Sequence, residues 1–156
     1  MKVYLDNSAT TPVKPEVAEV MFDVIKNNYG NPSSVHTFGQ EVKPIIDKAR
    51  NQVAQLINAK PNEIYFTGSG TEADNWAIKG AAFALKDKGN HIITSKIEHH
   101  AVLHTCEYLE KHHGFDVTYL DVDDKGFISL QELADSIRPE TILITIMYAN
   151  NEIGTV

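Results

Sequence analysis

Residues 64–75 have the residue types of an anion-binding turn. The run Ile-Tyr-Phe-Thr-Gly-Ser-Gly-Thr-Glu-Ala-Asp-Asn predicts a short apolar strand, a small turn and the start of a helix. The first amides of a helix have no intrahelical partner, and the helix dipole favours an anion beside them. Gly68 and Gly70 carry no Cβ, and Thr71 adds a hydroxyl, so phosphate is the expected occupant. The glycine spacing matches neither a P-loop nor a dinucleotide fingerprint, and an ordinary capped turn is the alternative.

Two further polar segments follow predicted strands. His99 comes shortly after a strand expected at 91–95, and Asn150 comes after one expected at 141–148. Because ligands of open α/β sheets bind at the carboxyl ends of the strands, a phosphate turn, an imidazole and an amide would meet at one edge. This set suits a phosphorylated aromatic cofactor, although ordinary loop residues would give the same pattern.

The elements that must position these residues follow from the spacing of apolar side chains. Residues 1–14 are expected to be extended. Helices are predicted at 15–28, 44–58, 71–87, 100–113 and 130–137, and strands at 64–67, 91–95, 116–121 and 141–148. The alternation from residue 62 onward predicts an α/β fold with a mainly parallel sheet and helices on both faces. We expect the last strand to be covered on both faces and the helix at 71–87, apolar on several sides, to pack between layers.

Composition limits the classes of partner. The chain has 156 residues, 42% of them hydrophobic, and a formal net charge of −7. An acidic chain without a basic run argues against nucleic acid and against an anionic membrane as the main partner. One cysteine excludes an internal disulfide, so a cytoplasmic location is expected.

Six segments together resemble one enzyme family. They are YLDNSATTP (4–12), YGNPSSVH (29–36), KAR (48–50), FTGSGTEADN (66–75), HIITSKIEHHAVL (91–103) and MYANNEIGTV (147–156). Their types and order resemble the NifS/IscS-type cysteine desulfurases, in the class V aminotransferase group of fold-type I pyridoxal-phosphate enzymes. The family usually has Ser-Gly where this chain has Gly68-Ser69, and either order keeps the turn small.

The resemblance implies a three-layer, pyridoxal-phosphate-binding large domain and a set of roles within it. It implies that Gly70 and Thr71 bind the phosphate of pyridoxal 5′-phosphate, that His99 stacks on its ring and acts as an acid/base, and that Asn150 contacts the cofactor and substrate. The implied reaction removes sulfur from L-cysteine to give L-alanine and an enzyme persulfide. The sulfur then passes to a scaffold or acceptor protein for iron–sulfur cluster or thio-cofactor assembly, and family members are homodimers.

The resemblance also implies that residues 15–156 are the N-terminal part of the large domain. The Schiff-base lysine and the nucleophilic cysteine of the family would lie beyond Val156, so we expect this chain alone to be inactive. Other class V enzymes, such as a selenocysteine lyase or an aminotransferase, remain alternatives, as does a non-catalytic fragment that acts only as a binding module.

Three other patterns have plainer explanations. Residues 121–132 resemble a calcium-binding EF-hand loop, but Lys125 stands at a ligand position and a strand is predicted before the loop. His100 and His104 have the spacing of a metal pair but are expected on a solvated helix face. Cys106 lies on the apolar face of its helix and is expected to be a buried, inert thiol. No metal site is therefore predicted.

Overall fold

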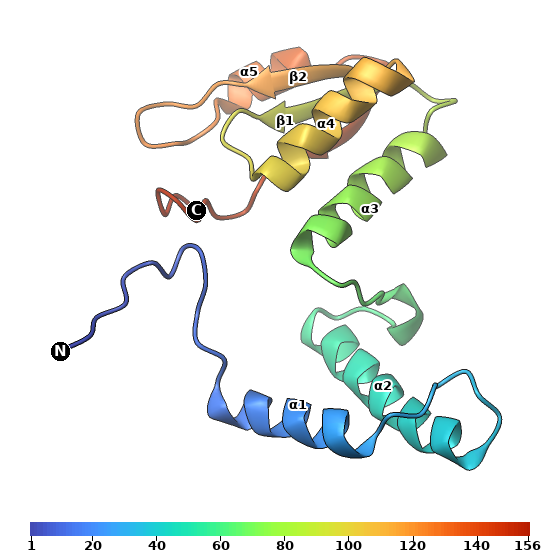
Figure 1. Cartoon of the computed structure of the whole chain (residues 1–156). Helices are drawn as coiled ribbons and strands as arrows, with labels where there is room; N and C mark the ends of the chain where they lie inside the picture. Colours follow the sequence, from blue (N-terminus) through green and yellow to red (C-terminus); the bar gives the residue numbers. More distant parts are fainter. The chain divides into compact units, whose positions relative to one another are not determined.

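The computed structural model describes all 156 residues, which form two compact units, Met1–Phe66 and Thr67–Val156. The first unit contains helices α1 (Pro15–Asn27) and α2 (Thr37–Leu56) and the 3₁₀ turn η1 (Pro61–Glu63) (Figure 1). Residues 1–14 contain no helix or strand. Pro15 and Glu16 lie in the first turn of α1, where a missing amide proton and a negative charge are both tolerated, and the helix predicted at 15–28 is confirmed.

The second helix begins seven residues earlier than predicted. It starts at Thr37, and Pro44 lies inside it. The prediction was that Pro44 either starts this helix or kinks it, because an internal proline loses a helical hydrogen bond. The earlier turns are instead supported by packing. Gly39 is buried so close to the backbone of Asn31 and Ser34 that a Cβ there would collide with both.

The second unit alternates helices and strands. Its elements are α3 (Gly70–Ala84), β1 (His91–Ser95), α4 (His100–His113), β2 (Asp116–Leu120), α5 (Leu130–Ser136) and β3 (Thr141–Thr145). The strands form a parallel sheet in the order β2-β1-β3 (Figure 1). The α/β class and the parallel sheet are thus as predicted.

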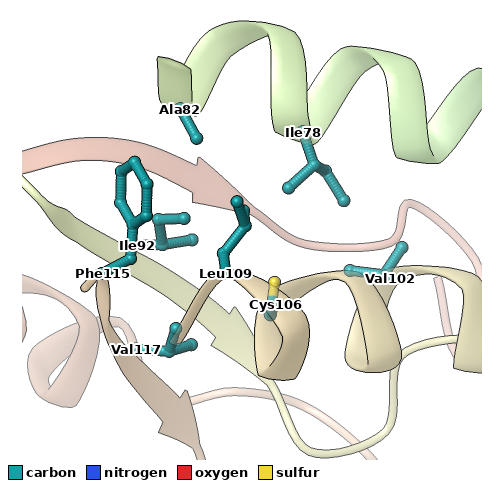
Figure 2. Packing of buried hydrophobic residues seen from close by; sticks show 8 residues of the cluster. All are labelled: Ile78, Ala82, Ile92, Val102, Cys106, Leu109, Phe115 and Val117. Atoms are coloured by element: carbon teal, nitrogen blue, oxygen red, sulfur yellow. The ribbon is translucent and has the colours of Figure 1, made fainter. Parts of the chain in front are cut away.

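The central strand β1 is buried along its whole length. Ile92 and Ile93 point to opposite faces of the sheet and neither is exposed, so both faces are covered. Figure 2 shows the cluster on one face, where side chains of α3 and α4 close over Ile92 and Val117. Helix α5 contacts β2.

Three expectations about buried elements are wrong. Residues 64–67 form no strand, and Tyr65 and Phe66 are 66% and 51% exposed. Strand β3 ends at Thr145 instead of 148, and Ile144 is 42% exposed, so the strand is not covered on both faces. Helix α3 buries Ile78 and Ala82 on one face only.

No helix in the structure is both long enough and apolar enough to cross a membrane.

Candidate functional site

The predicted anion-binding turn lies at the start of α3, and it carries a cap, the feature that the sequence suggested as the alternative. Ser69 caps the helix, and its Oγ accepts the amide of Glu72 at 3.2 Å. The carboxylate of Glu72 turns back and accepts the amide of Gly68 at 2.6 Å. These bonds resemble a capping box, a pattern readable as Ser-x-x-Glu at 69–72 that the sequence analysis did not identify.

The amides that remain for a ligand are those of Gly70 and Thr71, because the first helical residues have no intrahelical acceptor. Gly70 is helical, and a Cβ added to it would find no atom within 4 Å. Nothing within the chain therefore requires glycine here. A close ligand would require it, so an open cradle beside two free amides fits a phosphate group.

Thr71 and His99 line the same surface groove between α3 and α4. The groove has a volume of about 420 Å³, and Asn75, Lys79 and His104 also line it. Lys79 donates to Asn75 Oδ1 at 2.8 Å and lies 4.7 Å from the ring centre of Tyr108. Lys79 lies about two turns along α3 from Thr71, so the groove carries an ammonium group held by Asn75, and this positive charge favours an anionic ligand.

His99 is the N-cap of α4, and its Nδ1 accepts the amide of Ala101 at 3.1 Å. A nitrogen that accepts a hydrogen bond carries no proton, so the proton of the neutral ring lies on Nε2. The side chain is exposed and borders a second, smaller pocket of about 90 Å³ that Asn150 also lines. The structure therefore places His99 between Thr71 on one side and Asn150 on the other.

Asn150 is only 7% exposed, and its side chain is occupied within the chain. Its Nδ2 donates to Ile97 O at 2.9 Å and to Met147 Sδ at 3.3 Å, and its Oδ1 accepts the amides of Glu152 and Ile153. Only the bond to sulfur is weak, since a thioether is a poor acceptor. The observed role of Asn150 is to hold two turns together, and its contact with a ligand stays a prediction.

The sequence analysis missed Glu98, the buried carboxylate of this region. Glu98 is 7% exposed, and its Oε1 accepts the Ser95 hydroxyl at 3.2 Å and the Met147 amide at 2.5 Å. Burial raises the pKa of this carboxyl group, and the Met147 amide and the Ser95 hydroxyl oppose the rise. An acid three residues after the end of a buried strand was the available signal, because a buried acid must find donors nearby.

The structure also places the EF-hand-like loop and the His100/His104 pair. The strand expected before the EF-hand-like loop is present as β2, and Asp123 Oδ1 accepts the amides of Lys125 and Phe127. His100 and His104 are exposed with stacked rings 5.1 Å apart. Across the chain, no three His, Cys, Asp or Glu side chains are grouped so as to hold a metal.

Cys106 is buried, as expected, and burial raises the pKa of its thiol to about 11 (Figure 2).

Comparison with known proteins gives one consistent result. The family model described as Aminotransferase class-V matches residues 3–156. The chain is 60% identical over 154 residues to the cysteine desulfurase IscS of Methanosarcina thermophila, covering 99% of this chain and 38% of that protein. It is 55% identical over 155 residues to the putative cysteine desulfurase IscS 1 of Bacillus subtilis, covering 99% and 41%.

Solved structures agree with the sequence matches. A NifS-like protein superposes with a TM-score of 0.95 at 44% identity, covering all of this chain and 43% of that one. A structure of SspA in complex with cysteine gives a TM-score of 0.86 at 44% identity, covering 93% and 42%. The chain therefore spans about two fifths of the length of these relatives.

Proposed function

Because the chain belongs to the class V aminotransferase family, we propose that it forms the N-terminal part of the cofactor-binding domain of a cysteine desulfurase. The cofactor is pyridoxal 5′-phosphate, and the substrate is L-cysteine. The relatives named as cysteine desulfurases and the cysteine-bound SspA structure support the substrate. The observation that supports pyridoxal 5′-phosphate as the cofactor is the start of α3, where Gly70 leaves an open cradle beside two free amides.

The residues of the chain divide the work of holding the cofactor. The amides of Gly70 and Thr71 and the Thr71 hydroxyl would hold the phosphate, and the Lys79 ammonium group adds positive charge to the same groove. When bound, the cofactor supplies a pyridine ring that accepts electrons as bonds to the amino acid break.

His99 holds a proton at a defined atom. Since the amide of Ala101 occupies Nδ1, the neutral ring can donate only from Nε2. The exposed ring borders both pockets, so a bound ligand in either one lies next to it. This arrangement supports stacking on the cofactor and an acid/base role at Nε2.

The family resemblance of the six sequence segments supports a wider role. We propose that the complete enzyme is a homodimer that keeps the sulfur as a persulfide and passes it to a scaffold or acceptor protein.

Thr71→Ala tests the phosphate site. Loss of the hydroxyl should weaken binding of pyridoxal 5′-phosphate roughly 10- to 150-fold, the range for one hydrogen bond to a charged group. The affinity is measured by titration with amide NMR detection, and pyridoxal, which has no phosphate, should bind equally to both forms. Thr37→Ala, which removes a hydroxyl from the first turn of α2, is the matched control. Equal affinity of the Thr71 and Thr37 variants for the cofactor would refute the site.

A further inference from the structure

Glu98 joins two turns that are far apart in the sequence. It lies between the end of β1 at Ser95 and the start of α4, directly before His99. Its Oε1 reaches the backbone amide of Met147, 49 residues away, in the turn that follows β3. One carboxylate oxygen therefore connects the carboxyl ends of two neighbouring strands.

A second bond joins the same two turns. The Asn150 side chain donates to the carbonyl of Ile97, the residue before Glu98. Two links at adjacent positions fix both the separation and the orientation of the turns. His99 and Asn150 line one pocket, and Glu98 lines it as well. The geometry of this pocket thus depends on a buried carboxylate.

Burial of the Glu98 carboxylate is energetically unfavourable. No cation pairs with Glu98, and a buried charge without a counterion is expensive even when it is hydrogen-bonded. A carboxylate can accept from Ser95 and Met147 with one oxygen, and charge-assisted bonds are about twice as strong as neutral ones. Strong, short bonds at a site edge provide rigidity that an apolar side chain cannot provide.

We propose that Glu98 is a positioning residue that fixes the His99 turn against the end of β3, so that the His99 ring keeps one orientation in the pocket. The proposal rests on the proposed function only for the role of His99 toward a ligand. It assigns Glu98 no contact with substrate or cofactor.

The test compares side chains that separate length from charge. Glu98→Gln keeps the length and one acceptor oxygen, and Glu98→Asp keeps the charge but is too short to reach the Met147 amide. Two signals are read in the chain without cofactor, namely hydrogen exchange of the Met147 amide and the ¹⁵N shifts of the His99 ring. In Glu98→Ala and Glu98→Asp, exchange should speed up roughly 10- to 100-fold, as expected for a lost bond to a charged acceptor. The ring shifts should also change, because the ring no longer keeps one position in the pocket. Glu98→Gln should preserve the ring shifts and keep the exchange rate within tenfold of the wild-type rate.

Two controls isolate positioning from general loss of stability. Glu152→Gln changes an exposed carboxylate at the same pocket, and Val117→Ala weakens the core away from the turn. Neither should move the His99 shifts. If Glu98→Ala does not fold, the Asp and Gln variants make the same comparison.

Wild-type exchange and ring shifts in Glu98→Asp would overturn the proposal, and so would their loss in Glu98→Gln. Altered signals in the Asp variant together with a failed cofactor titration would refute the proposed function alone. Unchanged signals together with normal cofactor binding would refute the positioning role alone.

Discussion

His91 shows how one buried side chain can tie a sheet together. It is fully buried in β1, and its two ring nitrogens lie 2.8 Å from the hydroxyls of Thr141 in β3 and Thr118 in β2. Burial is the main cause that lowers the pKa of His91, and the Arg138 guanidinium lowers it further, although Asp116 and Glu140 act in the opposite direction. Folding therefore favours the neutral form of the His91 ring.

The lowered pKa predicts a loss of stability in mild acid. Below pH 6.5 the unfolded chain takes up a proton on this histidine more readily than the folded chain, so the free energy of unfolding falls as the pH decreases. Between pH 7.5 and pH 5.5 the loss due to His91 should be at most about 1.4 kcal/mol, the limit for a folded state that takes up no proton. His91→Gln keeps a donor and an acceptor but cannot titrate, and urea unfolding at both pH values should show a smaller difference. His112→Gln, on the exposed end of α4, is the control, and an unchanged pH dependence in His91→Gln would contradict the assignment.

Two glycines at helix ends of the second unit, Gly114 and Gly70, differ in the reason for which glycine is needed. Gly114 ends α4 in the left-handed region with φ of 70°, and its amide bonds to Leu109 O, whereas Gly70 lies in the first turn of α3. A Cβ would meet no atom within 4 Å at either position. Any cost of Gly114→Ala is therefore conformational, and any cost of Gly70→Ala concerns a ligand.

Alanine substitutions should separate these two requirements. Gly114→Ala should lower the free energy of unfolding by about 1 kcal/mol, because a side chain is disfavoured in the left-handed region. Gly70→Ala should leave stability unchanged or slightly higher, because alanine favours the helix, yet it should weaken binding of pyridoxal 5′-phosphate. Thermal unfolding and cofactor titration of both variants measure this. Full cofactor affinity in Gly70→Ala would show that the open cradle is not used.

The two units differ in how much apolar surface they bury. The second unit contains a packed cluster around Ile92, Cys106 and Leu109, whereas α1 has no buried residue and leaves Phe22 and Ile25 more than half exposed. Hydrophobic burial is the main source of stability, so the units should open with different free energies.

Amide hydrogen exchange of the whole chain measures this difference. The amides of β1 and of the buried face of α4 should exchange slowest, by about two orders of magnitude or more relative to α1. Ile92→Ala should accelerate exchange throughout the second unit, because removing a fully buried side chain costs about 2–5 kcal/mol. Equal protection in α1 and β1 would contradict the assignment of the main core to the second unit.

The sequence by itself determined the features that depend on neighbouring residues. Apolar spacing was sufficient for α1, α4, β1 and β2, and the alternation of elements was sufficient for the parallel sheet. The same local signals identified the segments that carry Gly70, Thr71, His99 and Asn150, because turn residues after apolar strands are readable one segment at a time.

Only the tertiary structure decided what depends on partners distant in the sequence. Residues 64–67 have the residue types of a strand but no neighbouring strand, and α2 extends past Pro44 because a loop packs on Gly39. The link from Glu98 to the Met147 amide and the bond from the Asn150 side chain to Ile97 O could not be read from spacing, since each needs a donor or acceptor brought close by folding. Hydrogen bonds act over about 3 Å, and only the packed chain fixes which groups come within that distance.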